Sequence, residues 1–347
     1  METPPRVATF GEIMLRLSPP GLNRFAQARS LDVAFGGGEA NVAVCLARWG
    51  MPARFVTRLP NNDIGHACVE ALRGHGVETG HVVWGGERIG IYFLETGAVA
   101  RPSKVLYDRA HSALAEIRRG MIDWDTAFAG CDWFHWTGIT PAISEGAADA
   151  CLEAVQTARA CGMQISCDLN YRSKLWRWGG NPDDVMSELV SLADVAIGNE
   201  EDAERIFGLK AGDTEVTSGE VDPSQYESIC NALTERFPNL RLVAITLRGS
   251  CSASHNSWSS VLWTDGKLHA ARRYEITHIV DRVGAGDSFA AGLIHGLHSH
   301  PGEPGKALEF ATAASCLKHT VHGDFNLVSL DEVTRLLEGD SSGRVAR

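Results

Sequence analysis

The sequence predicts an α/β protein in which a mostly parallel sheet carries helices on both faces. Strand-like runs alternate with helix-like runs along most of the 347 residues, and no repeat of solenoid length interrupts the alternation. Helices of this length return the chain to the start of the next parallel strand and cover the sheet from both sides. Hydrophobic residues make up 44% of the chain and charged residues 22%, a balance typical of a folded globular protein.

Short apolar runs predict the strands, and runs with apolar residues three or four positions apart predict the helices. The expected strands are residues 7–13, 54–59, 133–139, 164–170, 195–198 and 242–247. The expected helices are residues 39–49, 64–75, 145–160, 184–192, 200–207, 226–237, 287–298, 306–321 and 330–337. Between these elements the connections are short, as expected when strands and helices alternate.

Two segments break the alternation. Residues 15–35 and 88–109 are strand-like or rich in turns and contain no helical run, with strands expected at 89–95 and 105–109. Neighbouring β insertions of this kind often form a flap over a binding site. A pair of ordinary surface hairpins would have the same spacing, so both interpretations stay open at this point.

Charge and cysteine content narrow the function and the compartment. A net charge of −11 argues against non-specific nucleic-acid binding, although local N–H groups, Mg²⁺ and a few arginines could still hold a nucleotide. The nine cysteines include no C-x-x-C pair, which favours free thiols in a reducing cytoplasm. The first residues carry no signal-peptide pattern, and no apolar run is long enough to cross a bilayer, so no membrane partner is expected.

The run from Asp281 to Phe289, DRVGAGDSF, places a glycine turn and a carboxylate at the start of a predicted helix. Gly284 and Gly286 allow a sharp turn and close approach of a ligand. The N–H groups of the first helical turn favour an anion. Asp287 has two interpretations: an ordinary N-cap, or a base that accepts a proton from a hydroxyl attacking a phosphate.

Polar side chains follow several of the predicted strands. Asn170, Asn199 and Arg248 each come after a strand, so they could reach one crevice at the carboxyl edge of the sheet. The carboxylate of Asp202 could hold Mg²⁺ through water, or could belong to an acidic first helical turn facing solvent. In the turn GGGEAN, Asn41 suits hydrogen bonding to a polyol, or caps a neighbouring group.

Other nucleotide and metal motifs are missing from the sequence. It contains no G-x-x-x-x-G-K-[ST], which argues against a P-loop enzyme, and no G-x-G-x-x-G, which argues against a dinucleotide site. The thirteen histidines show no metal-ligand spacing.

Four motifs together carry a resemblance to the ribokinase-like (PfkB) carbohydrate kinase family. They are residues 36–41, 168–172, 199–202 and 284–287, in the family's order and over nearly the whole chain. Residues 107–110 (YDRA), 246–258 and the arginine at position 282 are most similar to the 2-keto-3-deoxygluconate kinases. The resemblance implies a three-layer α/β/α domain from residues 1–14, 36–87 and 112–347, with a small β lid from residues 15–35 and 88–111.

The resemblance also implies a reaction: transfer of the ATP γ-phosphoryl to the C6 hydroxyl of 2-keto-3-deoxygluconate. Asp287 would be the general base, and the backbone of Gly284, Ala285 and Gly286 the anion hole. The implied sugar contacts, besides Asp287, are Gly37, Asn41, Tyr92, Tyr107, Arg109 and Arg172. The implied nucleotide contacts, besides Gly284 and Gly286, are Asn199, Thr246, Arg248 and Gly249. Asp202 would bind Mg²⁺ indirectly, and the carbonyls of Asp281 and Val283 would lie near a monovalent cation such as K⁺.

The arginines support an acid sugar independently, because a guanidinium can read a carboxylate through two contacts. Either Arg109 or Arg172 could instead pair with a protein carboxylate such as Asp108. No aspartate stands near Arg16, where many neutral-sugar kinases have one, and Asp202 replaces the family's usual glutamate. The alternatives are a kinase for fructose or 2-keto-3-deoxygalactonate, or a non-catalytic sugar-binding sensor. Lids exchanging strands across a two-fold axis would favour a homodimer or a multiple of dimers.

Overall fold

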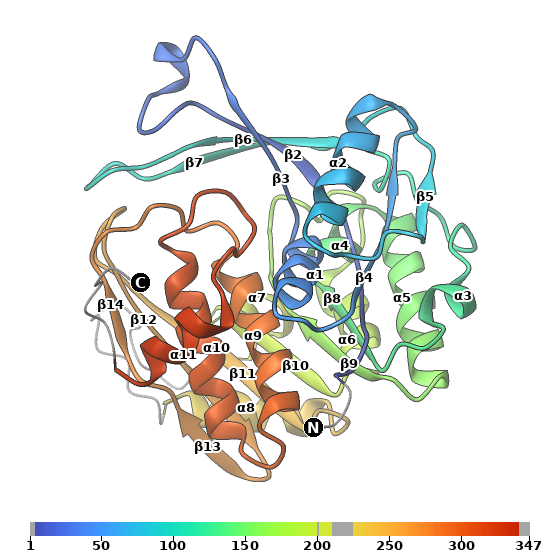
Figure 1. Ribbon diagram of the computed structural model, residues 1–347. Coiled ribbons are helices and arrows are strands. Elements are labelled where there is room, and N and C mark those ends of the chain that lie inside the picture. The colour runs from blue at the N-terminus through green and yellow to red at the C-terminus, as the bar shows by residue number, and fades with distance from the viewer. Residues whose placement is uncertain (1–3, 200, 210–224, 340–347) are drawn as a thin grey trace.

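The computed structural model describes residues 4–199, 201–209 and 225–339 and contains a large central sheet and a small separate one. Helices cover both faces of the large sheet, and the small sheet projects from one end of it (Figure 1). The predicted α/β/α architecture with a β lid is confirmed. The ends of the predicted domain, residues 1–3 and 340–347, and the first residue of the predicted helix 200–207 lie outside the described residues.

The central sheet is parallel through most of its width. Its strands run in the order β13-β12-β11-β10-β9-β8-β1-β4-β5, and β14 also pairs with β12. The parallel strands are β1 (Val7–Phe10), β4 (Ala53–Leu59), β5 (Val82–Trp84), β8 (Trp133–Thr137), β9 (Gln164–Asp168), β10 (Val195–Asn199) and β11 (Leu242–Ser250). Because they run the same way, the carboxyl ends of these strands meet at one edge of the sheet.

Two layers of helices bury the two faces of the sheet. One layer contains α1 (Gly38–Arg48), α2 (Asp63–Gly74), α9 (Ala285–Ser299), α10 (Pro304–Lys318) and α11 (Leu330–Leu337). The other contains α3 (Trp124–Phe128), α4 (Ile139–Ile143), α5 (Glu145–Ala160), α6 (Pro182–Val190), α7 (Asp202–Phe207) and α8 (Gln225–Arg236). Along β1, Val7 packs in the first layer's core, whereas Ala8 and Phe10 pack in the second. No helix in the described residues is long and apolar enough to span a bilayer.

An antiparallel edge of the central sheet was not predicted. It consists of β12 (Asn256–Thr264), β13 (Lys267–Ala270) and β14 (Tyr274–Ile276). The predicted strand 242–247 extends to Ser250 because β11 pairs with β12 along its full length. Conversely, the predicted strand 7–13 ends at Phe10, and the chain crosses from there into the lid.

The lid is a four-stranded sheet in the order β3-β2-β6-β7. Its strands are β2 (Met14–Ser18), β3 (Asp32–Gly36), β6 (Gly90–Glu95) and β7 (Lys104–Asp108), with a short 3-10 turn η1 (Phe25–Gln27) between β2 and β3. Cross-strand pairing aligns Arg16 with Tyr92, and Tyr92 with Tyr107, so these three side chains share one face of the lid. That face is turned toward the cleft, which Tyr92 and Tyr107 line.

Candidate active site

A cleft of about 680 Å³ lies between the lid and the carboxyl ends of the central strands. Most residues predicted for the site line it. They are Gly37, Asn41, Tyr92, Tyr107, Arg109, Arg172, Asn199, Asp202, Thr246, Arg248, Val283, Gly284, Ala285, Gly286 and Asp287. Gly249 and Asp281 are not among the lining residues: Gly249 pairs with Ser257 within the sheet, and the Asp281 side chain is buried in an ion pair.

The glycine turn before α9 opens a helix start into the cleft. Gly284 is the N-cap residue of α9 and has a φ of 83°, in the left-handed region that favours glycine. A Cβ at this position would stand 2.1 Å from the carbonyl oxygen of Asp324, so a side chain would push the turn off the neighbouring loop. The first N–H groups of α9 have no partner within the helix, and the Ala285 N–H makes only a long bond of 3.4 Å to the Arg282 carbonyl, so this helix start can receive an anion in the cleft.

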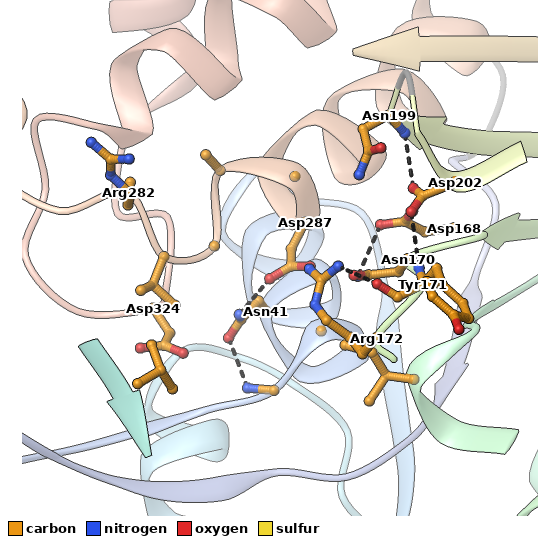
Figure 2. Close-up of a pocket in the computed structure, with 18 of the residues that line it drawn as sticks. Asn41, Asp168, Asn170, Tyr171, Arg172, Asn199, Asp202, Arg282, Asp287 and Asp324 are labelled. Atoms are coloured by element: carbon orange, nitrogen blue, oxygen red, sulfur yellow. Dashed lines mark hydrogen bonds between the residues drawn. The ribbon is translucent and has the colours of Figure 1, made fainter. Parts of the chain in front are cut away.

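Asp287 lies in the first turn of α9 with its carboxylate directed at Asn41 (Figure 2). The Asn41 amide donates to Asp287 Oδ2 at 2.6 Å and accepts from the backbone N–H of Gly37 at 3.3 Å. Burial raises the pKa of Asp287 to about 6, while the hydrogen bond from Asn41 and the charge of Arg172 act in the opposite direction. A carboxylate with this pKa is ionised near neutral pH and still basic enough to accept a proton.

Gly37 fits closely into the base of the cleft. A Cβ on this residue would lie 2.0 Å from the backbone oxygen of Glu12, where the chain passes from β1 to the lid. This contact places the turn between β3 and α1 against the first strand and sets the position of Asn41, one helical turn later. Glycine is therefore required at position 37 by close packing, in the turn that the sequence predicted to bind a polyol.

Two further carboxylates form one wall of the cleft. Asp168, at the end of β9, accepts from Asn170 Nδ2 at 3.3 Å, and Asp202 accepts from the backbone N–H groups of Tyr171 and Asn199 at 3.0 and 2.9 Å (Figure 2). Burial and then the nearby charge of Asp202 raise the pKa of Asp168. This concentration of negative charge favours a cation in the cleft.

A second wall carries positive charge. Arg248 is exposed at the end of β11, and Arg282 is half-buried, with its Nη2 donating to the carbonyl of Ala253 at 2.7 Å. Burial and then the charge of Arg248 lower the pKa of Arg282. Two guanidinium groups close enough to oppose each other are suited to an anion such as a polyphosphate between them. Thr246 and Asn199 also line this part of the cleft.

The lid is fastened to the core by buried charged groups. Arg16 donates to Asp281 Oδ2 at 2.5 Å and to Asp324 Oδ1 at 2.8 Å, and all three side chains are less than one-tenth exposed. The Tyr92 hydroxyl donates to the Asp324 carboxylate at 2.6 Å. Two lid strands thus reach the loops on either side of α9 and α10.

The two predicted acid-sugar arginines differ in their surroundings. Arg109 is buried and pairs with Glu12, through Nε at 2.7 Å and through Nη2, and its guanidinium lies 5.7 Å from the Tyr107 ring centre. Arg172 is exposed at the rim, where Nη1 donates to the backbone carbonyl of Tyr171 at 2.8 Å (Figure 2). The partner of Arg109 is therefore Glu12, whereas Asp108 pairs with Arg88.

The sequence interpretation did not assign Asp324, Glu12, Arg16 or Lys318 to the site. Asp324 lines the cleft yet follows α10 in a stretch with no recognisable motif, so only its contacts with the lid identify it. Glu12 lies in the predicted strand 7–13 and Arg16 in the β insertion 15–35, where a buried charge has no sequence signature. Lys318 ends a helix, a position that usually indicates nothing more than a favourable charge at the C-terminus.

The donor groups in the cleft suit Mg²⁺ held mainly by water and phosphate. In the described part of the chain no three His, Cys, Asp or Glu side chains converge as a metal site. Each Asp202 oxygen already accepts one backbone N–H group. The remaining acceptor capacity of the carboxylate suits contact with the ion through a water molecule. Mg²⁺ commonly keeps several waters and takes one or two carboxylates together with substrate phosphates.

An anion-binding helix start, a raised-pKa carboxylate beside it and a lidded polar cleft define a phosphotransferase that acts on a small hydroxyl compound. Residues 4–329 match the profile described as pfkB family carbohydrate kinase. The chain belongs to this family and is a carbohydrate kinase.

Relatives of known identity extend over nearly the whole chain. A solved structure of 2-dehydro-3-deoxygluconokinase from Thermotoga maritima is 47% identical, with a TM-score of 0.91, covering 96% of this chain and 99% of its own. The 2-dehydro-3-deoxygalactonokinase of Haloferax volcanii is 34% identical over 97% of this chain and 98% of its own length. The 2-dehydro-3-deoxygluconokinase of Thermoproteus tenax is 27% identical over 92% of this chain and 89% of its own.

Proposed function

We propose that this kinase transfers the γ-phosphoryl of ATP to the C6 hydroxyl of 2-keto-3-deoxygluconate. One observation carries the proposal: the Asp287 carboxylate, held by Asn41, lies at the start of α9 in a cleft with an arginine wall on one side and the lid on the other. A base beside an anion-binding helix start is the minimum needed to bring an alcohol and a phosphoryl group together.

In the proposed transfer, the Asp287 carboxylate takes the proton of the C6 hydroxyl as the new oxygen–phosphorus bond forms. The bond between the γ-phosphorus and the β–γ bridging oxygen breaks, and ADP leaves. N–H groups of Gly284, Ala285 and Gly286 stabilise the transferring group, since the turn directs the helix start into the cleft. Asn41 orients the base, because its amide is fixed in turn by Gly37.

The carboxylate of the sugar is assigned to Arg109, which follows lid strand β7, and to Arg172, which follows β9 of the central sheet. Arg172 is the freer of the two, exposed at the rim with one backbone contact from its guanidinium. Arg109 faces the same cleft but shares its charge with Glu12, so its contribution to the sugar is directional more than electrostatic. Tyr92 and Tyr107 would pack beside the sugar from the lid.

On the nucleotide side, Arg248, Thr246 and Asn199 line the part of the cleft assigned to ATP. Gly249 remains a proposed backbone contact one residue beyond that wall. Asp202 would hold Mg²⁺ through water, and the ion would supply positive charge that offsets phosphate charge during the transfer. A K⁺ ion near the carbonyls of Asp281 and Val283 was also expected. Lys318 is fully buried beside the same turn and carries an ammonium group of the chain itself.

The closest alternative substrate is 2-keto-3-deoxygalactonate, since one relative is named for it and another for the gluconate. The two acids differ at one stereocentre, which changes the direction of a single hydroxyl. Fructose is a weaker candidate because it has no carboxylate for Arg172.

A homodimer through the lid is also part of the proposal. Pairing aligns Val33 with Leu17, Leu17 with Phe93, and Phe93 with Leu106, so an apolar row crosses the lid on the face opposite Tyr92. Val33 and Leu106 are 65% and 58% exposed. A second lid packed on this row would cover it, and Val33→Glu together with Leu106→Glu should then give a monomer in sedimentation. We place the enzyme in the cytoplasm, the compartment of ATP and of free thiols such as its nine cysteines.

The test is coupled ADP release with a panel of both keto-deoxy acids, fructose and ribose, each at saturating ATP and Mg²⁺. We expect the highest kcat/KM with 2-keto-3-deoxygluconate and at least tenfold less with the neutral sugars. A preference for fructose would overturn the substrate class, and sugar binding without ADP release would indicate a sensor.

A further inference from the structure

A fully buried lysine lies behind the anion-binding turn, and no step of the proposed transfer uses it. Lys318, the last residue of α10, is 0% exposed, and its Nζ donates to the carbonyl of Val321 at 3.1 Å. In the described part of the chain no carboxylate comes within ion-pair distance of this ammonium. A buried charge without a direct counter-ion is costly, so its retention calls for a reason.

The position of Lys318 suggests that reason. Its Cε lies 3.4 Å from the point that a Cβ on Gly284 would occupy, directly behind the proposed anion hole. One turn earlier in α10, the Ser315 hydroxyl donates to the carbonyl of Ala285 at 2.7 Å. One face at the end of α10 therefore touches both Gly284 and Ala285.

The residue after Lys318 fixes the other side of the same turn. The carbonyl of His319 accepts the backbone N–H of Val280 at 2.8 Å and of Asp281 at 3.2 Å. The loops 280–284 and 319–324 are thus held against each other, with the Lys318 side chain at their base.

Burial lowers the pKa of Lys318, and the charge of Arg16 acts in the same direction. The carboxylates of Asp281, Asp324 and Asp287 oppose that shift and favour the ammonium form. Arg16 already pairs with Asp281 and Asp324. Lys318 therefore adds a buried positive charge behind the turn, in addition to the Arg172 charge that acts on Asp287 from the cleft.

We propose that Lys318 is a positioning residue for the anion hole: its side chain, packed behind Gly284, supplies a cation of the chain itself that holds the turn and makes a bound monovalent metal ion unnecessary. This inference rests on the proposed function. It replaces the K⁺ expected near the carbonyls of Asp281 and Val283 with a group of the chain itself.

The experiment compares wild type with Lys318→Met, a neutral side chain of similar length, in KCl, NH₄Cl and tetramethylammonium chloride at equal ionic strength. Wild-type kcat should change less than twofold among the salts. In tetramethylammonium, Lys318→Met should lose about 100-fold in kcat, with little change in KM for the sugar. K⁺ or NH₄⁺ should restore at least tenfold of that loss by entering the vacated space.

Thr312→Val is the matched control, because Thr312 is fully buried on the same helix and bonds Ser260 and the Leu308 carbonyl, away from the turn. It should change the melting temperature without creating any response to K⁺. A merely structural role for Lys318 would give the same pattern as this control.

Thermal unfolding supplies a readout that does not depend on finding the right sugar. K⁺ relative to tetramethylammonium should raise the melting temperature of Lys318→Met and leave that of wild type unchanged. Tenfold or greater activation of wild type by K⁺, a K⁺-dependent rise in its melting temperature, or wild-type kcat in Lys318→Met would each overturn the proposal. If Lys318→Met does not fold, the K⁺ dependence of wild-type kcat and of the wild-type melting temperature still tests the proposal. An inactive sugar panel with the expected melting shifts would count against the proposed substrate only.

Discussion

The core side and the lid side of the cleft present functional groups to the same space in different ways. On the core side the groups come from loops at strand ends and from the first turn of α9, so backbone N–H groups and short side chains dominate. On the lid side they come from strands or strand ends, and long-range partners hold Tyr92, through Asp324, and Arg109, through Glu12. Behind them Arg16 pairs with Asp281 and Asp324.

The difference shows where rigidity comes from in each half. The core side is set by local backbone geometry, for example the left-handed turn at Gly284. The lid side depends on ion pairs between segments more than 90 residues apart, which a sufficiently strong competing interaction can exchange. The proposed base and anion hole therefore lie on the core side, whereas the lid adds Tyr92, Tyr107 and Arg109 to the proposed sugar contacts.

Removing the base should give the largest effect. Asp287→Asn should lower kcat by ~10²–10⁴-fold, because proton acceptance is lost while the hydrogen-bonding geometry toward Asn41 changes little. Steady-state kinetics on both keto-deoxy acids measure the loss. The variant should keep its sugar affinity in calorimetry, and its melting temperature should not fall, since a buried charge is removed. Near-normal turnover would assign the proton to another group.

Releasing the lid anchor should mainly affect stability. Arg16→Met leaves Asp281 and Asp324 as buried carboxylates without their partner, at a cost of about 3–5 kcal/mol in the free energy of unfolding. Urea unfolding followed by fluorescence measures the change. Adding Asp281→Asn and Asp324→Asn to Arg16→Met should recover part of the loss. A loss below about 1 kcal/mol would mean that the lid is held by its strands alone.

Arg109→Ala should weaken binding of the acid sugar by about 1.5–3 kcal/mol, seen as a higher KM, through the loss of charged hydrogen bonds. The substitution also leaves the buried Glu12 carboxylate without its ion-pair partner. The double variant Arg109→Ala, Glu12→Gln separates this loss of stability from the loss of sugar binding. If Arg109 contacts the sugar, the double variant should be more stable than Arg109→Ala, while its KM for the acid sugar should stay as high as in Arg109→Ala. An unchanged preference for the acid over a neutral analogue in both variants would leave Arg172 as the only reader of the carboxylate.

The smallest effect should appear in the pH profile. With the pKa of Asp287 at about 6, kcat/KM should fall as pH drops below 6, because the base becomes protonated. Asn41→Ala removes a donor that stabilises the carboxylate and should move this acid limb upward by about one pH unit. An acid limb that stays at its wild-type pH in Asn41→Ala would show that another group controls it.

The raised pKa of Asp287 also makes the free energy of unfolding depend on pH. The folded-state pKa lies above the ordinary value of 3.8, so ionisation of Asp287 disfavours the fold. Its contribution to the free energy of unfolding should therefore become less favourable as pH rises from about 4 to 6. Asp287→Asn should remove this contribution from the stability profile.

The sequence predicted the core side of the site better than the lid side, for a physical reason. Gly284, Asp287 and Asn41 stand in short runs where local backbone geometry dictates the residue type, so spacing alone indicated a site. Asp324 and Glu12 owe their roles to partners far away in the chain, and nothing local distinguishes them from other acidic residues. The antiparallel edge was missed because β12 mixes serine, tryptophan and leucine without a clear alternation.

The junction between β3 and α1 has a further consequence. β3 is an outer strand of the lid and ends at Gly36, and α1 begins at Gly38, so one residue separates the lid from the turn that positions Asn41. The position of the lid strand and the orientation of the base are therefore connected through Gly37, whose N–H donates to Asn41. If contacts of a sugar with the lid position this turn, a sugar too short to reach the lid should bind yet be turned over slowly, because its binding would no longer help to align Asn41 and the base.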